Sequence, residues 1–155
     1  EEVNKIPDWI VHEINNRYLK FKQNFSCNSN FYIYRRETTN THCQIINDDE
    51  VKDYLIKKGF SIYKVGTLNF FEQIYLFNNA KIIIGAHGAA FANLVFCNKD
   101  TKVIDIIPKS HPNLVDASIS KYKKLNFNYI KTKKLHDKNL NGDILLDIND
   151  LNKLI

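Results

Sequence analysis

A run of small residues around one histidine is the part of this chain best suited to bind an anion. The aliphatic segment Ile82–Ile84 leads into a loop, Gly85–Gly88, and a helix is expected from about Ala89 to Cys97. An aliphatic run without alternation is typical of a strand that is covered on both faces. A helix that begins directly after it presents unpaired N–H groups and the positive end of its dipole, which suits a phosphate.

Each residue of this segment has an expected part in the site. Gly85 and Gly88 lack a Cβ atom, so the backbone can come close to a ligand. Ala89 and Ala90 keep the first helical turn thin, and Asn93, one turn later, can point into the same space. The GxxG spacing is neither the GxGxxG of dinucleotide-binding folds nor a P-loop, so the glycines alone are a weak signal.

His87 is the titratable residue of the loop. Its imidazole can donate to a phosphate oxygen or, once protonated, neutralise its charge. The competing interpretation is a histidine that only bonds a neighbouring carbonyl in a tight turn. Its place between two glycines at the carboxyl end of a strand favours the ligand role.

Two further features belong to the same sheet edge. Arg35 and Arg36 follow the predicted strand Phe31–Tyr34, and a guanidinium there can bind a diphosphate bidentately, although an exposed pair that only adds solubility is the alternative. Asp105 lies within the predicted strand Lys102–Ile107, where an unpaired carboxylate is costly to bury. We therefore expect Asp105 to face the cleft and bind ribose hydroxyls, or to pair with a cation such as Arg35.

Strands and helices alternate along the chain. The expected strands are Phe31–Tyr34, Ser61–Val65, Lys81–Ile84, Lys102–Ile107 and a short Phe127–Ile130. The expected helices are Asp8–Phe21, one from Asn47 to Gly59, one beginning at Asn69, Ala89–Cys97, Pro112–Leu125 and Asn149–Ile155, with Lys131–Gly142 as a loop. This alternation predicts an α/β fold, a Rossmann-like parallel sheet with helices on both faces. We expect a single domain spanning residues 1–155.

Local patterns predict where some helices begin. Asn47 with Glu50, and Asn69 with Glu72, have the spacing of a capping box. Phe70, Phe71, Ile74 and Phe77 are expected to form the buried stripe of the helix that follows Asn69. The last helix is expected to be capped by Asn149 or Asp150.

Composition limits the classes of protein and of partner. With 155 residues, 44% hydrophobic and 25% charged, the chain is an ordinary globular domain. A net charge of +5 suits an anionic ligand, an anionic membrane surface or nucleic acid without distinguishing them. No aromatic-basic motif of a nucleic-acid reader is evident, so no nucleic-acid partner is expected. The late lysines favour a solvated surface and leave a peripheral membrane contact open: Lys121, Lys123, Lys124, Lys131, Lys133, Lys134 and Lys138.

Cysteine usage indicates a reducing compartment. Cys27, Cys43 and Cys97 form no CxxC pair, so neither a metal site nor a disulfide framework is expected. Reduced thiols point to the cytoplasm. No apolar run approaches the ~20 residues of a membrane span. Glu1–Asn4 lacks a signal-peptide pattern, and we expect further sequence upstream.

An ordered series of residues from about Phe31 to Pro108 resembles the family 61 glycosyltransferases. That family includes capsular-polysaccharide enzymes, plant pentosyl- and xylosyltransferases, and animal N-acetylglucosaminyltransferases that act on protein O-linked sugars. The series consists of Arg35-Arg36, Glu50-Val51, Gly59-Phe60, Phe71-Glu72-Gln73, Leu76-Phe77, Ala80, Ile83-Ile84-Gly85, His87-Gly88-Ala89, Asn93, Phe96 and Val103-Ile104-Asp105 before Pro108. It departs from the family at Ala90, Ala92 and Asp105, where Gly, a smaller polar residue and Glu are common.

The resemblance implies a GT-B architecture, in which two Rossmann-like halves enclose the active site. This chain looks like the C-terminal half, which holds a nucleotide-sugar donor, with the N-terminal half of the enzyme missing. The loop His87–Ala89 and Asn93 would then bind the diphosphate of a UDP-linked sugar, and Arg35 or Arg36 would neutralise it. The implied reaction is inverting transfer to a hydroxyl of a glycan or polysaccharide acceptor, with no metal and no other cofactor.

The resemblance also defines what this chain lacks. His87 is expected to stabilise the leaving group, whereas no general base is evident and the other half is expected to supply it. The alternative function is a non-enzymatic Rossmann-like module that binds or holds a partner. Relatives occur in bacterial cytoplasm and in the eukaryotic secretory lumen, so the expected location is cytoplasmic, with membrane association open, or the lumen if the source is eukaryotic.

Overall fold

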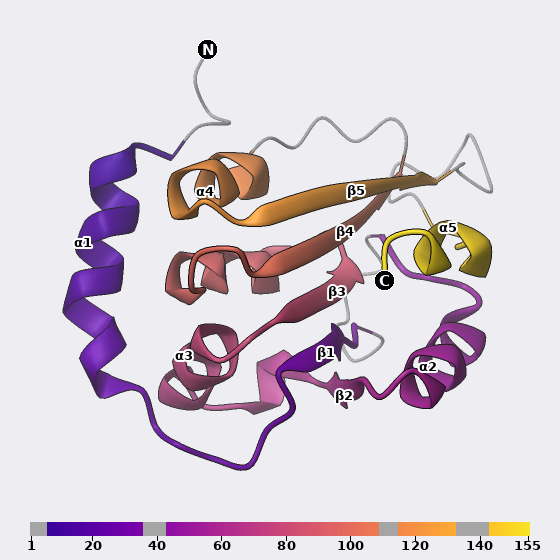
Figure 1. Ribbon diagram of the computed structural model, residues 1–155, viewed down its shortest axis with the longest axis horizontal. Helices are drawn as coiled ribbons and strands as arrows, with labels where there is room; N and C mark the ends of the chain where they lie inside the picture. The colour runs from indigo at the N-terminus through magenta and orange to yellow at the C-terminus, as the bar shows by residue number, and fades with distance from the viewer. Residues whose placement is uncertain (1–5, 36–42, 109–114, 133–142) are drawn as a thin grey trace.

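The computed structural model describes residues 6–35, 43–108, 115–132 and 143–155. A five-stranded parallel sheet forms its centre, built from β1 (Asn30–Ile33), β2 (Ser61–Tyr63), β3 (Ile82–Ala86), β4 (Lys102–Pro108) and β5 (Asn126–Thr132). The helices are α1 (Asp8–Tyr18), α2 (Asp48–Lys57), α3 (Phe70–Asn78), α4 (Val115–Lys123) and α5 (Ile148–Asn152). Three 3₁₀ segments join them: η1 (Leu19–Phe21), η2 (Val65–Thr67) and η3 (Ala89–Phe96). The predicted α/β fold with a parallel sheet between helices is confirmed (Figure 1).

The strand order is β2-β1-β3-β4-β5, which is the flavodoxin-like order of doubly wound sheets. The chain changes direction across the sheet between β1 and β3, and ligands of such folds bind outside the carboxyl ends of the strands at this point. Ile33 pairs with Gly85, and Gly85 pairs with Asp105. The register therefore brings the residues that follow β1 and β3 to the same edge, beside Asp105.

Two hydrophobic cores cover the two faces of the sheet. Side chains of α1, α3, η3 and α4 pack on one face, against Ile83 and Val103. Side chains of α2 and α5 pack on the other face, against Ile84 and Ile104. Successive residues of a strand point to opposite faces, so a strand buried on both sides is apolar without alternation. Helices on both faces, as the sequence predicts, are visible in Figure 1.

One predicted capping box is present and one is wrong. At α3, the Asn69 side chain accepts from the backbone N–H groups of Phe71 and Glu72, and the Glu72 carboxylate accepts from the Asn69 N–H. At α2, the Asn47 side chain makes no cap hydrogen bond. Its amide instead binds both backbone groups of Leu146, at 2.9 and 3.1 Å. A contact 99 residues away thus replaces the local cap.

The ends of several elements also differ from the prediction. Strand β3 continues through Gly85 and Ala86, and the following helix is 3₁₀ rather than α. Strand β5 runs on to Thr132, so Lys131 lies in a strand and not in a loop. The cap of α5 is Asp147, which accepts from the Asn149 N–H; neither Asn149 nor Asp150 is the cap. Residues 133–142, expected as a loop, lie outside the described residues.

The aromatic stripe predicted for α3 is only half buried. Ile74 and Phe77 are buried, but Phe70 and Phe71 remain 44% and 42% exposed. Their rings meet other exposed rings of the preceding helical segment, Phe70 against Tyr18 and Phe71 against Phe21. The first turn of α3 thus packs mainly against α1 and η1, although the Phe70 ring also meets the buried ring of Phe96.

Candidate functional site

A pocket of about 570 Å³ opens at the carboxyl edge of the sheet, at the switch point between β1 and β3, where the strand order changes direction across the sheet. Its walls come from the end of β1, from η2, and from the starts of α3 and η3. The lining residues are Ile33, Tyr34, Arg35, Val65, Gly66, Thr67, Gln73, Ala89, Ala90 and Asn93. Four residues singled out from the sequence, Arg35, Ala89, Ala90 and Asn93, therefore do meet around one cavity.

Two side-chain amides form a fixed part of the pocket wall. Asn93 Nδ2 donates to Gln73 Oε1 at 3.0 Å and to the Ala90 carbonyl at 3.2 Å. Gln73 Nε2 donates to the Leu68 carbonyl at 3.0 Å. Sequence reasoning placed Gln73 only within the family resemblance and missed it as a pocket residue. Its place one turn into α3 looks like any polar helix position.

Arg35 is held against the turn after β3. Its Nη1 donates to the carbonyl oxygen of His87. A Cβ atom on Gly88 would lie 2.5 Å from Nη1 and 2.6 Å from Cζ of Arg35. The backbone of Gly88 is extended, so its φ angle does not call for glycine; the guanidinium occupies the space that a Cβ atom would fill. Burial lowers the pKa of Arg35, partly offset by Cys43, Asp105 and Tyr32, yet arginine stays charged throughout.

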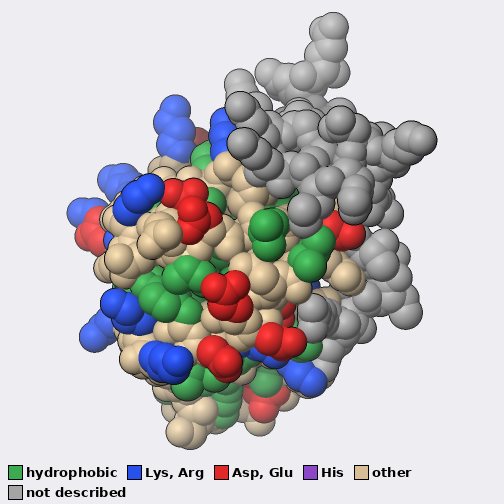
Figure 2. All heavy atoms as spheres, turned by 90° about the vertical axis from the view of Figure 1, so that its right-hand side faces the viewer, with side chains coloured by type: hydrophobic (Ala, Val, Ile, Leu, Met, Phe, Trp, Pro, Cys, Tyr) green, Lys and Arg blue, Asp and Glu red, His purple; other side chains and the backbone are tan. Residues whose placement is uncertain are grey.

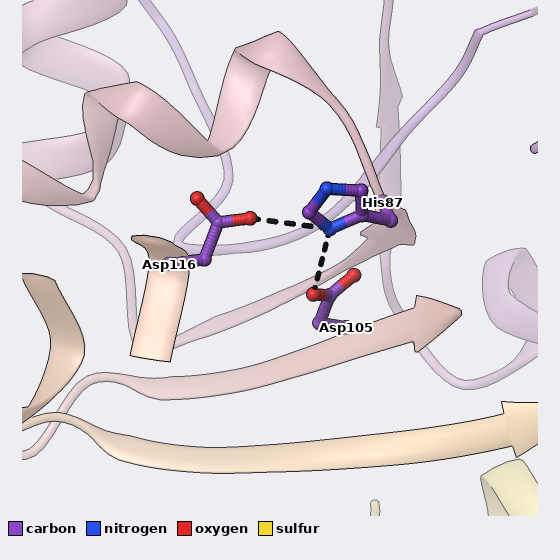
Figure 3. A group of neighbouring side chains, drawn as sticks. All are labelled: His87, Asp105 and Asp116. Carbon is purple, nitrogen blue, oxygen red and sulfur yellow. Dashed lines mark hydrogen bonds and ion pairs between the residues drawn. The ribbon is translucent and has the colours of Figure 1, made fainter. Parts of the chain in front are cut away.

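The His87 ring meets two carboxylates on the other side of this turn. Its Nδ1 lies 3.0 Å from Asp105 Oδ2 and 3.2 Å from Asp116 Oδ2. Figure 3 shows both carboxylates approaching the same ring nitrogen, Asp105 from β4 and Asp116 from α4. All three side chains are buried. Asp105 thus meets a hydrogen-bond partner, His87, while its expected part in binding the donor stays a prediction.

The proton affinities in this cluster reflect burial and mutual charge. Burial alone lowers the pKa of His87, but the hydrogen bond to Asp105 and the charges of Asp105 and Asp116 outweigh it. The pKa of His87 is therefore raised, although Arg35 opposes this. Burial raises the pKa of Asp105 despite His87 and Arg35. Burial likewise raises the pKa of Asp116 to about 6, with His87 opposing and Asp105 adding to the shift.

The same three donor atoms lie within 4.8 Å of one another, a separation that a metal ion also allows. Positive charge at this cluster can come from a protonated His87, which contacts both carboxylates, and from Arg35, whose charge acts on Asp105. The expectation of no metal stays a prediction, and a shared proton at Nδ1 also fits this geometry.

The other residues that the sequence assigned to the site do not line the pocket or lie outside the described residues. Gly85 lies inside β3, where an added Cβ would be 3.0 Å from Ile33 Cβ, so its lack of a side chain serves packing. His87 and Asp105 lie beside the pocket and are not among its lining residues. Arg36 lies outside the described residues. Asp116 was missed, because one acidic residue in the first turn of a helix is an ordinary feature.

Charged side chains of both signs lie on the described surface. In Figure 2, basic and acidic side chains are interspersed over the described part of the face that bears α2 and α5. Lys123 and Lys124 line a separate open cavity, with Lys99 and His12, near the amino end of β4. Lys133, Lys134 and Lys138 lie outside the described residues. Within the described ranges, no helix has the length and apolarity to cross a bilayer.

Comparison with known proteins gives an independent view of the same residues. The family described as glycosyltransferase 61 matches residues 3–104, which include the pocket, the turn and His87. The beta-1,2-xylosyltransferase RCN11 of Oryza sativa subsp. japonica is 38% identical over 63 residues, which cover 41% of this chain and 12% of that protein. The chain thus spans a small part of this relative. Since the family match extends over most of the sequence, the chain belongs to the glycosyltransferase 61 family.

Proposed function

We propose that this domain holds the nucleotide-diphosphate sugar of a glycosyltransferase, with UDP as the nucleotide. The observation that carries the proposal is the pocket of about 570 Å³ at the switch point, into which Arg35, Ala89, Ala90 and Asn93 converge. Its volume lies within the roughly 300–1,000 Å³ of small-molecule sites. In the full enzyme the domain is one half of a GT-B architecture, and a second half completes the cleft.

The diphosphate is assigned to the side of the pocket formed by Arg35 and the start of η3. A guanidinium already braced by the His87 carbonyl is pre-organised, so little side-chain entropy is lost when it binds phosphate oxygens. The first N–H groups of η3 point out of the helix start and add donors without charge. Both features meet at Ala89 and Ala90.

The nucleoside is assigned to the opposite side of the pocket. Ile33, Val65 and the Tyr34 ring offer apolar surface to a base or ribose. The fixed amides of Gln73 and Asn93 offer hydrogen-bonding groups of defined orientation. Mostly apolar walls with a few fixed polar groups are typical of small-molecule pockets.

The proposed reaction is direct displacement at the anomeric carbon by an acceptor hydroxyl of a glycan or polysaccharide, with inversion. The departing diphosphate gains negative charge, and stabilising that charge is the main electrostatic demand. Arg35 and the η3 amides meet this demand. Direct contact of His87 with the leaving group stays a prediction, because its ring faces Asp105 and Asp116.

The general base is assigned to the missing half. Among the lining residues that the structure describes, none carries a carboxylate or an imidazole that could take the acceptor proton. A donor half that binds but does not complete the reaction is consistent with this lining. No metal takes part in the proposed step.

Binding of UDP to the 155-residue chain tests the proposal. Calorimetry should show saturable binding of UDP, weakened about tenfold by Arg35→Ala, the scale of one hydrogen bond to a charged group. Lys99→Ala, in the separate cavity, is the matched control and should leave the affinity unchanged. Undetectable binding of millimolar UDP to the folded chain would exclude the donor site.

A further inference from the structure

The turn after β3, strand β4 and helix α4 meet at the His87 ring, and α4 lies outside the residues that match the family. Asp105 and Asp116 both follow residue 104, where the family match ends. Nδ1 carries at most one hydrogen, which is shared with Asp105 at 3.0 Å, while Asp116 Oδ2 lies 3.2 Å away. Within the part of the chain that the structure describes, Asp116 Oδ2 and Asp105 Oδ1 are buried and accept no hydrogen bond. Two buried carboxylates beside one ring nitrogen favour a positively charged ring.

The ring is connected to the pocket through the backbone of its own turn. The His87 N–H donates to the Ile106 carbonyl at 2.9 Å, which fixes the turn to β4. The His87 carbonyl accepts from Arg35, and Gly88 leaves room for that guanidinium. Arg35 and Ala89, on either side of this contact, both line the pocket. The ring and the pocket wall are therefore parts of the same turn.

We propose that Asp116 is a positioning residue that, with Asp105, clamps the His87 ring so that the His87 carbonyl keeps Arg35 in the wall of the donor pocket. This assignment rests on the proposed function only for the identity of the ligand. Asp105 ties the turn to β4, and Asp116 ties it to α4. Asp116 does not touch the donor and acts through His87 and Arg35.

The clamp makes the pocket wall sensitive to protonation. The groups that face the ring are Asp105 from β4, Asp116 from α4 and Arg35 after β1, while Tyr129 from β5 faces the two carboxylates. The carboxylates raise the pKa of His87, so the imidazolium persists above its ordinary range and the clamp is lost as pH rises through that raised value. Protonation of Asp116, with a pKa of about 6, removes the second carboxylate in acid.

Histidine NMR of the full chain measures the clamp without any ligand. In the unmodified chain, the Gly88 amide and the Arg35 side-chain resonances should follow the titration of His87, identified from the peak lost in His87→Gln. Asp116→Asn should lower the pKa of His87, whereas Asp100→Asn, an exposed carboxylate with positive φ that suits Asn, should not. UDP affinity near neutral pH should fall about threefold to tenfold in Asp116→Asn only, equal to roughly 0.7–1.4 kcal/mol.

The possible outcomes separate the clamp from the donor site. An unchanged pKa of His87 in Asp116→Asn would overturn the clamp. The clamp would also be overturned if the Gly88 and Arg35 resonances of the unmodified chain do not change as His87 titrates, a measurement that needs no Asp116 variant. Stoichiometric Zn²⁺ or Mn²⁺ held by the cluster and released by EDTA would also overturn it, in favour of a metal site. If UDP fails to bind while the titrations behave as stated, the clamp stands and the donor-site proposal fails.

Discussion

At the scale of single residues, Gly85 in β3 and Gly88 in the turn after it are glycines for different physical reasons. An added Cβ at Gly85 would meet Ile33 Cβ at 3.0 Å and Phe91 Cζ at 3.4 Å inside the core. At Gly88 it would meet the end of the flexible Arg35 side chain. The first neighbour cannot move without its backbone, whereas the second can move away.

We therefore predict opposite consequences for the two alanine variants. Gly85→Ala should lower the free energy of unfolding by about 1–3 kcal/mol, the usual cost of overpacking a core. Gly88→Ala should leave stability nearly unchanged but displace the guanidinium and weaken UDP binding about tenfold. Urea unfolding and calorimetry on both variants measure this. Equal effects of both variants on stability would show that Arg35 cannot move.

The pKa of Asp116 predicts a dependence of stability on pH. Its value of about 6 in the folded chain exceeds the ordinary 3.8, so the folded state binds the proton more tightly than the unfolded state. The stability that this provides is present below the unfolded pKa and is lost as pH rises through about 6. The raised pKa of His87 acts in the same direction at higher pH.

Urea unfolding of the chain and of Asp116→Asn at a series of pH values tests this. From pH 4 to 7 the stability of the unmodified chain should fall relative to the variant by at most about 3 kcal/mol, the equivalent of a shift of roughly two units. Asp100→Asn controls for the loss of one charge. A difference that is constant with pH would mean that Asp116 has an ordinary pKa.

At the scale of elements, a helix cap could be predicted from the sequence where the polar groups that form it are close together in the chain. Asn69 and Glu72 are three residues apart, and their capping box could be predicted from the sequence alone. Asn47 and Glu50 have the same spacing, but the Asn47 side chain instead donates to the Leu146 carbonyl and accepts from the Leu146 N–H. Asp116 was invisible for the same reason, because its partner His87 lies in another element. Local pattern cannot reveal a distant competitor for the same polar atoms.

The Asn69 cap gives a prediction at this scale. Asn69→Ala should lower the free energy of unfolding by about 1 kcal/mol, since two N–H groups at the start of α3 lose their acceptor. Asn69→Asp keeps the acceptor and should retain most of the stability. Thermal or urea unfolding distinguishes the two variants. No loss in Asn69→Ala would mean that water replaces the cap at no cost.

At the scale of the whole molecule, the alternation of strands and helices was enough to predict the parallel sheet and the helices that pack on both of its faces. The edge that gathers Arg35, the turn after β3 and Asp105 followed from the same reasoning, because parallel strands end on one side. Which residues at that edge line the pocket, and which pack behind the turn, could not be predicted. Arg35, Ala89, Ala90 and Asn93 line the pocket, while His87 and Asp105 lie behind the turn with Asp116. Side-chain packing between β4 and α4 decides this, and spacing does not encode it.

The lining of the pocket also predicts what the domain cannot do alone. No described lining residue offers a base for the acceptor hydroxyl, so the chain should bind UDP yet release no sugar from UDP-linked donors above the uncatalysed rate. Assays of UDP release from several UDP-sugars, with and without sugar acceptors, measure this. Turnover that survives Arg35→Ala points to a contaminant. Turnover by the chain that Arg35→Ala abolishes would place the base within these 155 residues.

The central claim is that the switch-point pocket is the nucleotide site, and mapping UDP onto the chain by NMR chemical-shift perturbation tests it most directly. Saturating UDP should shift the amide resonances of Ala89 and Ala90 and the side-chain resonances of Arg35, Gln73 and Asn93. Lys99, Lys123 and Lys124, at the separate cavity, should stay unperturbed. Perturbations confined to those lysines, with the pocket residues unchanged, would contradict it.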